Sequence, residues 1–239
     1  MKETMIFELC KQLKIAYVGD IIKEYDESTK ELIYELLNAE IEGRKRAKLG
    51  KLIQSSNLPQ IKTFEGYDFN EITFPNNMNK EKLLSLEWVK SKENVILLGN
   101  VGTGKSHMSI ALAVEASKKG MTTKFYRVSD LIEILKDKHK KETLSRFRIM
   151  LKKLDILILD EVGYIPFDQL GSELLFNVLA DSYERQSIIV TTNLNFGQWA
   201  SIFGDTTMTR ALVDRLVHHS HVITFQGQTK RLAYALNEK

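Results

Sequence analysis

The sequence has little of what a secreted or membrane-embedded protein needs. Its 239 residues include one cysteine, Cys10, so an internal disulfide is excluded and a reducing compartment is favoured. No apolar run is long enough to span a bilayer, and the first residues lack the apolar core of a signal peptide. We therefore expect a cytoplasmic protein with no membrane as a partner.

A strong excess of charge is also missing. The 34 lysines and arginines are balanced by 31 aspartates and glutamates, which leaves a formal net charge of +3. Such a balance does not require nucleic acid as a partner, so the positions of the basic residues carry more information than their sum. The length and the 43% hydrophobic content suit one large domain, or one medium domain with a small companion.

The most informative stretch lies between residues 95 and 119. Four apolar residues predict a buried strand, and G-x-x-x-x-G-K-S and a helical run follow it directly. In such a loop the backbone N–H groups and the positive end of the helix point at the phosphates of a nucleotide. The stretch predicts an ATP site formed by Gly99, Asn100, Val101, Gly102, Thr103, Gly104, Lys105 and Ser106.

A second apolar strand, 154–160, ends in two adjacent carboxylates. Ligands of open α/β sheets bind at the carboxyl ends of strands, which places Asp160 and Glu161 beside the glycine loop. We expect Lys105 to reach the β- and γ-phosphates, and Ser106 and Asp160 to hold Mg²⁺. Glu161 would polarise a water molecule for attack on the γ-phosphate, so the pair favours hydrolysis.

From Lys80 onward, stretches typical of helices and of strands alternate. Strands are expected at 95–98, 122–128, 154–160, 187–192 and 222–225, with helices at 80–92, 107–119, from 129, 170–185 and 211–217. Alternation of this kind predicts an α/β fold, in which a parallel sheet carries helices on both faces. Asn193 ends the strand 187–192 and is placed to hydrogen-bond the γ-phosphate or the attacking water.

The first 66 residues have a different character. They predict a helix at 5–17 and another that starts near Ser28, before prolines, glycines and asparagines interrupt the pattern, so we place a domain boundary near residue 66. Along the second helix glutamates come first, and then Arg44, Lys45, Arg46 and Lys48. These basic residues fit two interpretations equally, complementarity to the helix dipole and a stripe for DNA phosphates.

Several blocks of the sequence resemble one family. The order of a glycine loop, an Asp-Glu strand, an Asn-terminated strand and a late arginine is similar to that of AAA+ ATPases. Within them, blocks 160–166, 183–185, 191–194 and 211–219 resemble the IstB-like helper ATPases of bacterial insertion sequences, relatives of the DnaC helicase loaders. The resemblance implies an AAA+ P-loop domain at 67–239, preceded by a small all-helical domain at 1–66 for DNA binding and oligomerisation.

The resemblance also implies roles for single residues. Asn193 matches sensor 1, and Arg215 matches the arginine finger that enters the nucleotide site of a neighbouring subunit, with Arg210 as a second candidate. A guanidinium supplied in this way stabilises the transferring phosphoryl group only when subunits touch. Arg231 falls at the sensor 2 arginine, but Thr-Lys-Arg stands where Ser-Tyr-Arg is expected, so either Lys230 or Arg231 would face the nucleotide.

Basic residues are concentrated between 136 and 153. The resemblance places DNA contacts of the AAA+ domain in this region, so we expect phosphate contacts from Lys138, Lys140, Lys141 and Arg146. A solvated helix face is the alternative interpretation.

The sequence as a whole predicts an ATPase that uses ATP and Mg²⁺ and forms a homo-oligomer on duplex DNA. The resemblance implies that it helps a cognate transposase to engage target DNA. A helicase loader of the DnaC or DnaI type, acting on single-stranded DNA, is the first alternative. A nucleotide kinase with the same loop is the second, and the absence of an evident acceptor-binding lid argues against it.

Overall fold

The computed structural model describes residues 2–164, 166–203, 206–227 and 229. The chain divides into two compact units, of which the first ends at Lys51 and the second begins at Leu52. No helix within these described ranges is both long and apolar enough to cross a lipid bilayer.

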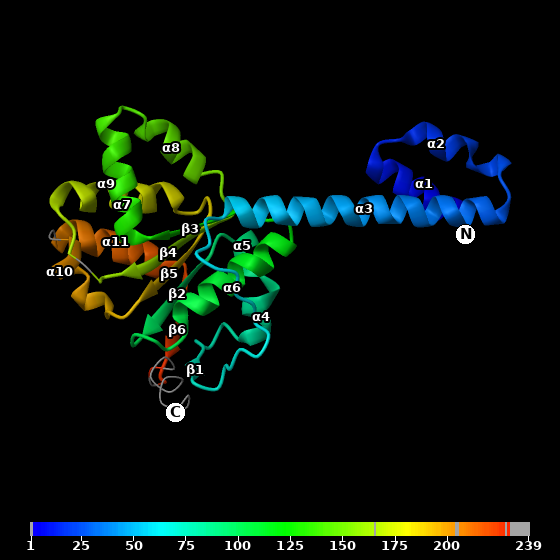
Figure 1. Cartoon of the computed structure of the whole chain (residues 1–239). Helices are drawn as coiled ribbons and strands as arrows, with labels where there is room; N and C mark the ends of the chain where they lie inside the picture. Colours follow the sequence, from blue (N-terminus) through cyan, green and yellow to red (C-terminus); the bar gives the residue numbers. More distant parts are fainter. Residues whose placement is uncertain (1, 165, 204–205, 228, 230–239) are drawn as a thin grey trace, which may run out of the picture. The chain divides into compact units, whose positions relative to one another are not determined.

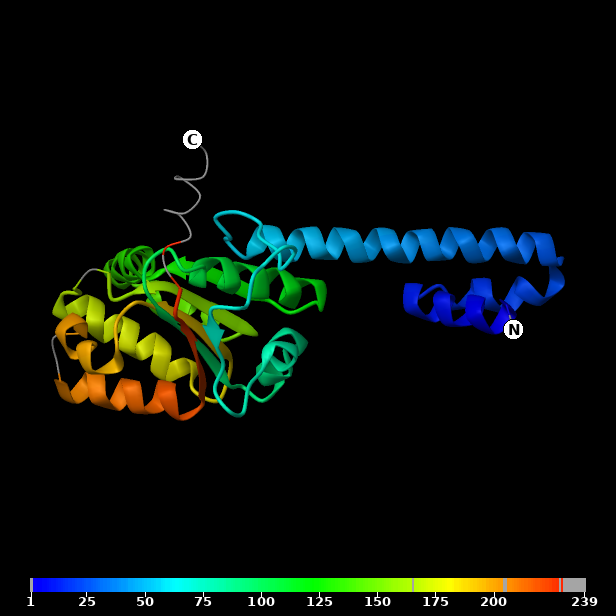
Figure 2. The same ribbon diagram turned by 90° about the horizontal axis from the view of Figure 1, so that it is seen from below.

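The first unit is all-helical, as the sequence predicts. It contains α1 (Lys2–Leu13), α2 (Ala16–Ile21), the short 3₁₀ helix η1 (Ile22–Glu24) and most of α3 (Glu27–Ser55). Figure 2 shows α1 and α2 lying alongside the beginning of α3. Ile6, Cys10 and Ile22 are buried at the centre, where Ile33 and Leu37 of α3 pack against them. This burial raises the pKa of the Cys10 thiol, as expected for a packed cysteine.

The start of α3 is fixed by a side chain just before the helix. Asp26 accepts hydrogen bonds from the Thr29 N–H at 2.8 Å and from the Ser28 hydroxyl at 2.7 Å, so it caps the helix, whose start the sequence places near Ser28. One turn later the ammonium of Lys30, a buried side chain, donates to Glu3 at 2.6 Å and to Glu27 at 3.2 Å. This bridge ties α1 to α3.

The segment that follows α3 belongs to the second unit. The Phe125 N–H donates to the Ser56 carbonyl at 2.8 Å, the Lys124 ammonium donates to Asn57 at 3.3 Å, and the His107 ring lies 2.8 Å from the Thr63 carbonyl. The sequence places the boundary near residue 66 because periodicity fades there. In the structure the irregular stretch between α3 and β1, residues 56–71, packs on the second unit, and we call it the strap. The division between the two units therefore lies between Lys51 and Leu52.

A six-stranded sheet forms the middle of the second unit. Its order is β1 (Ile72–Thr73), β6 (Ser220–Phe225), β2 (Asn94–Gly99), β5 (Ser187–Thr192), β4 (Ile156–Val162) and β3 (Thr123–Arg127). All neighbouring pairs are parallel except β1 with β6, which is antiparallel. The parallel α/β sheet predicted from the sequence is therefore confirmed, with β1 as an addition that its two residues gave no pattern to reveal.

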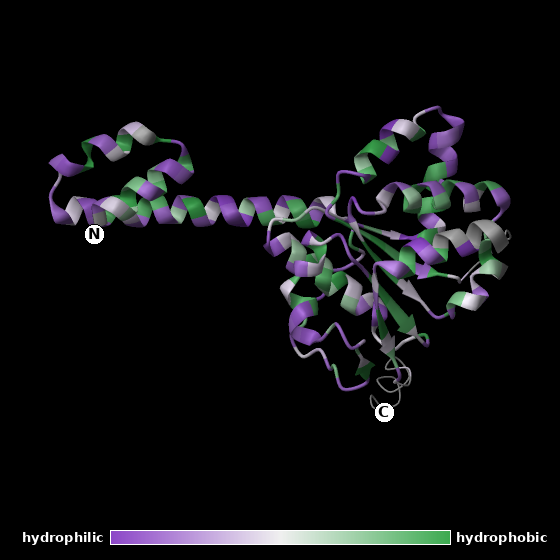
Figure 3. Cartoon of the chain, turned by 180° about the vertical axis from the view of Figure 1, so that it is seen from behind, coloured by the Kyte–Doolittle hydropathy of each residue, from purple (hydrophilic) through white to green (hydrophobic). Residues whose placement is uncertain are grey.

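Helices cover both faces of this sheet (Figure 1). One face carries α4 (Lys80–Ser85), α5 (Glu87–Lys90) and α6 (Lys105–Lys118), whereas the other carries α7 (Val128–Lys140), α8 (Leu144–Leu151), α9 (Gln169–Ser182), η2 (Phe196–Gln198), α10 (Ala200–Phe203) and α11 (Thr206–His218). Successive residues of β4 alternate between the two cores, with Ile156 and Ile158 on one side and Leu157 and Leu159 on the other. Figure 3 shows the resulting apolar strands at the centre.

The helix expected at 80–92 is divided in two. Leu86 adopts a left-handed conformation with φ of 60°, which ends α4 and starts α5. The Trp88 indole then donates to the Leu83 carbonyl at 3.0 Å, so the break brings a large buried ring under the first turn. The hydrophobic pattern of the sequence does not distinguish such a break from a continuous helix.

Candidate nucleotide site

The glycine loop joins the carboxyl end of β2 to the amino end of α6. Gly102 and Gly104 have φ of 81° and 101°, a conformation that favours glycine, and Gly104 directly precedes the first helical residue. A Cβ at Gly102 would collide with the Thr229 side chain. The Thr103 hydroxyl donates to the Asn100 carbonyl at 2.8 Å and closes the loop. The strand, loop and helix predicted for a phosphate site are thus all present.

Lys105 is held across this loop. Its side chain is buried, and its ammonium donates to the carbonyls of Gly99 at 2.8 Å and Asn100 at 2.7 Å. The charge therefore lies among the backbone groups of the loop, where the phosphates of a nucleotide would bind.

The two residues predicted to hold a metal ion lie together. The Ser106 hydroxyl donates to a carboxylate oxygen of Asp160 at 2.9 Å, and the Thr191 hydroxyl donates to the same oxygen at 2.6 Å. Asp160 is 3% exposed, so these hydrogen bonds fix its position in the sheet. An alcohol and a carboxylate are ligands that suit Mg²⁺.

Glu161 is the residue where β4 departs from regular pairing. Its φ is 62°, unusual for a residue with a side chain, and the register between β4 and β5 shifts at this point. Its N–H donates to the Thr191 hydroxyl at 2.9 Å. The carboxylate is 42% exposed and lies 3.9 Å from the guanidinium Nε of Arg127. The irregular backbone turns the side chain of Glu161 outward, beside the buried Asp160.

A pocket connects these groups. It is lined by Val101, Gly102, Lys105, Ser106, Glu161, Tyr164, Thr191, Thr192 and Asn193. Asn193 follows the last residue of β5 and is exposed, as the sequence analysis expects for a residue that faces the nucleotide. The structure thus brings together the loop, the two carboxylates and Asn193, which are far apart in the sequence.

The sequence analysis did not identify Thr191. A β-branched residue inside an apolar strand is most simply interpreted as core, yet its hydroxyl serves both Asp160 and the backbone of Glu161. The signal that could have found it is its place, a hydroxyl at the carboxyl end of a buried strand next to the Asp-Glu strand.

Tyr67 is a second residue that the sequence analysis did not identify. Its hydroxyl donates to the Gly104 carbonyl at 3.2 Å, and its ring lies 4.9 Å from that of His107. Burial raises the pKa of Tyr67, so the phenol stays protonated and able to donate. The strap that follows α3 therefore holds the start of α6 as well as covering the core.

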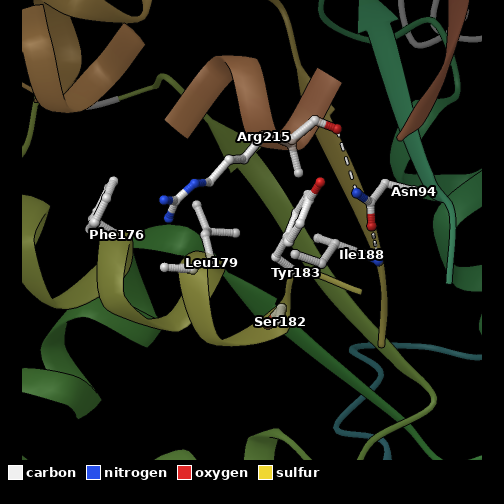
Figure 4. A pocket seen from close by; sticks show the side chains of 9 residues that line it. Asn94, Phe176, Leu179, Ser182, Tyr183, Ile188 and Arg215 are labelled. Atoms are coloured by element: carbon white, nitrogen blue, oxygen red, sulfur yellow. Dashed lines mark hydrogen bonds between the residues drawn. The ribbon is translucent and has the colours of Figure 1, made fainter. Parts of the chain in front are cut away.

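Arg215 lies at the other end of the sheet. It lines a second pocket with Phe176, Leu179, Tyr183 and Ile188 (Figure 4). Asn94, the first residue of β2, also lines this pocket, and its side-chain oxygen accepts from the Ile188 N–H at 2.8 Å. The glycine loop begins at the opposite end of β2, and six extended residues span roughly 20 Å. Arg215 therefore cannot reach the glycine loop of its own chain. Arg210 is exposed on the same helix, α11.

Some of the basic residues proposed to contact DNA form ion pairs within the chain, and others do not. Arg44 pairs with Glu40 at 2.7 Å, Lys45 with Glu42 at 2.8 Å, and Lys141 with Asp137 at 2.9 Å. Within the described ranges no ion pair is found for Arg46, Lys48, Lys138, Lys140 and Arg146. Lys138, Lys140, Lys141 and Arg146 flank the turn between α7 and α8.

Two further basic residues of this segment have a structural role. Arg148 and Lys152 both bind Asp181 of α9, with Nε at 2.7 Å and Nζ at 2.9 Å from the carboxylate. These pairs fasten α8 to α9. Arg231 and Lys230, proposed to face the nucleotide, lie outside the described residues.

Comparison with known proteins places this site in context. Residues 16–237 match the family described as IstB-like ATP binding protein. The ATP-binding protein of insertion sequence IS5376 from Geobacillus stearothermophilus is 34% identical over 97% of this chain and 95% of its own. AMPPCP-bound DnaA from Aquifex aeolicus has a TM-score of 0.59 at 22% identity, covering 77% of this chain and 57% of DnaA. DnaI has a TM-score of 0.58 at 18% identity, covering 77% of this chain and 100% of its own.

Proposed function

Because this chain belongs to the IstB-like ATP-binding proteins of insertion sequences, we propose that it hydrolyses ATP as an oligomer on duplex DNA and thereby helps a transposase to engage its target. ATP binding and the AAA+ fold follow from the family and from the fold of DnaA and DnaI. Hydrolysis, assembly and DNA binding are proposed from the geometry described above, and a transposase as partner is proposed from the relatives.

The network around Asp160 carries the proposal of hydrolysis. Ser106 and Asp160 would hold Mg²⁺, and the ion would supply charge neutralisation at the phosphates. No cluster of three histidine, cysteine, aspartate or glutamate side chains suited to a metal occurs within the described ranges. Glu161, exposed beside this pair, orients a water molecule, and Asn193 donates to the water or the γ-phosphate.

Arg215 supports assembly. An arginine at the amino ends of the strands is of no use to the ATP of its own chain. It can stabilise a γ-phosphate only in a neighbouring copy, which makes hydrolysis depend on contact between subunits.

The basic side chains without an ion pair support DNA as the partner. Lys138, Lys140 and Arg146 lie around the turn between α7 and α8, and Arg46 and Lys48 lie on α3. None of these five side chains forms an ion pair inside the described ranges. Cations of this kind contact phosphates irrespective of base sequence. The transposase is proposed from the insertion-sequence context of the relatives.

The second candidate is a helicase loader. The fold that this chain shares with DnaI favours it, while the identity of 18% makes that likeness one of fold alone. Equilibrium binding to duplex and to single-stranded DNA, with and without ATP, separates the two functions. Tighter ATP-dependent binding to duplex supports the transposition helper, and tighter binding to single strands contradicts it.

Glu161→Gln tests the proposed chemistry. The amide keeps the size of the side chain but cannot act as a base, so we expect ATP binding to stay within about twofold and hydrolysis to fall about 100-fold or more. Assemblies of this variant on duplex DNA should persist in ATP. Arg127→Gln is the matched control, because it removes the cation beside Glu161 but leaves the carboxylate. Unchanged hydrolysis in Glu161→Gln would remove this residue from the mechanism.

A further inference from the structure

Helix α3 has two apolar faces, and only one of them is covered. The inner face carries Ile33, Leu37 and Ile41, which are buried or pack on the core of the first unit. About 120° around the helix from it lies an outer face, with residues at every third or fourth position: Leu32, Leu36, Ala39, Gly43, Ala47 and Gly50. Leu32 is 56% exposed and Leu36 is 60% exposed.

The composition of the outer face changes along the helix. Its amino-terminal part has large leucines, and its carboxyl-terminal part has only alanine and glycine. Within the described ranges nothing lies within 4 Å of a Cβ built at Gly43 or Gly50, so no contact inside this chain requires glycine there. Glycine in the interior of a helix costs about 1 kcal/mol relative to alanine. A face of this kind allows a second helix to approach closely.

We propose that the outer faces of α3 from two copies of this chain pack against each other in antiparallel orientation. In that orientation Leu32 of one copy lies opposite Gly50 of the other, Leu36 lies opposite Ala47, and Ala39 lies opposite Gly43. Each large side chain meets a small one, and the two-fold symmetry repeats every contact. A parallel pair would instead set leucine against leucine at one end and leave glycine against glycine at the other.

The charges of α3 fit the same orientation. Four of its five glutamates, Glu27, Glu31, Glu35 and Glu40, lie in its first half, and all of its arginines and lysines except Lys30 lie in its second half. Antiparallel packing sets Glu35 of one copy near Arg46 of the other, along one edge of the contact, and brings the Glu40–Arg44 pairs of the two copies together along the other edge. A parallel pair would align like charges throughout.

This contact leaves room for DNA. Lys45 and Lys48 lie on the side of α3 opposite the outer face, so the pair would expose these basic side chains on both of its surfaces. The inference goes beyond the proposed function because the contact needs neither ATP nor DNA. It would join two chains before the nucleotide sites assemble.

Sedimentation of the purified chain without ATP or DNA tests the contact. We expect a dimer at tens of micromolar for the natural sequence and a monomer for Leu32→Glu/Leu36→Glu, with unchanged helical content in circular dichroism. Ile149→Glu, which places one glutamate at a side chain of 55% exposure on α8, is the control for a charge on an exposed apolar position and should remain dimeric. A monomeric natural chain, or a double variant that still dimerises, would overturn the proposal whatever the ATPase activity.

Disulfide trapping tests the orientation. Leu36→Cys and Ala47→Cys chains should cross-link when mixed and oxidised, and neither should cross-link alone, because equal positions are about 15 Å or more apart in an antiparallel pair. Cys10 is buried and gives no background. Cross-linking of either variant with itself would indicate a parallel pair and contradict the proposal. Absence of cross-linking in the mixture would assign the outer face to another occupant, the second unit or a different protein.

Discussion

The two units of the chain differ in the size of the apolar core that each one buries. Among the described residues of the first unit the buried cluster is small, formed by Ile6, Cys10 and Ile22, and α3 keeps an apolar face in solvent. In the second unit a sheet separates two extensive cores, and the polar groups of the candidate site are hydrogen-bonded between its strands. A self-sufficient core can hold a site rigidly, whereas a small core serves to present surfaces. The first unit is therefore where we look for partners and the second where we look for chemistry.

Replacing a buried isoleucine by alanine in each of the two units should give the largest changes in the free energy of unfolding. Ile158 of β4 and Ile6 of α1 are both 0% exposed. Ile158→Ala should destabilise the second unit by roughly 4 kcal/mol, because close packing on all sides prevents the cavity from collapsing. Ile6→Ala should cost only about 2 kcal/mol, because the small first unit can relax around it.

Thermal unfolding followed by circular dichroism, together with binding of a fluorescent ATP analogue, measures both variants. Ile6→Ala should lose helix at a lower temperature while ATP binding survives, and Ile158→Ala should lose both together. Simultaneous loss in both variants would show that the two units unfold as one, and the comparison between them would not hold.

Removal of the Thr191 hydroxyl tests how rigidly the second unit holds its site. Thr191→Val keeps the shape of the side chain but deletes the hydrogen bonds to Asp160 and to the Glu161 backbone. We expect kcat for ATP hydrolysis to fall about 10- to 100-fold with little change in ATP affinity, since the carboxylates lose their positions and the loop does not. Thr192→Val is the control, because that hydroxyl donates to the Val162 carbonyl. Equal losses in both variants would indicate general damage to the sheet.

The arrangement of the candidate nucleotide site could be predicted, because apolar strands and a glycine loop determine it by local rules. A run of apolar residues marks each strand, the parallel order brings the carboxyl ends together, and the Ser106–Asp160 contact follows from those two facts. Thr191 and Tyr67 could not be predicted, because their roles depend on strand register and on the path of a strap without periodicity. The division between the units at Lys51 has no signal in the sequence pattern, because α3 continues across it as regular helix.

Removing the ion pairs that attach α8 to α9 should have a smaller effect on stability, and that effect should depend on pH. Burial alone would raise the pKa of Asp181, but hydrogen bonds from Lys152 and Arg148 outweigh it and lower that pKa below its ordinary value of 3.8. The pairs therefore stabilise the fold above this value, and their contribution is lost as pH falls through the lower pKa of the folded state. Asp181→Asn should cost roughly 2 kcal/mol at neutral pH.

Urea unfolding of Asp181→Asn and of the natural chain at pH 7 and near pH 3 measures this contribution. The difference between them should shrink at the lower pH. Asp137→Asn removes an exposed carboxylate within α7 and should change stability little, because solvent screens its pair with Lys141. A difference for Asp181 that is independent of pH would mean that the side chain acts through packing.

The smallest expected effect concerns the basic turn between α7 and α8. Lys140→Glu/Lys141→Glu reverses two exposed charges, so we expect weaker duplex binding and a shallower dependence of log K on log salt, by about 2 in slope. Lys118→Glu/Lys119→Glu is the matched control, because it makes the same change at the end of α6. Titration of fluorescent duplex DNA at several salt concentrations measures both slopes. Equal slopes for the two variants would take the α7–α8 turn out of the interface and leave α3 of the first unit as the candidate for the DNA contacts.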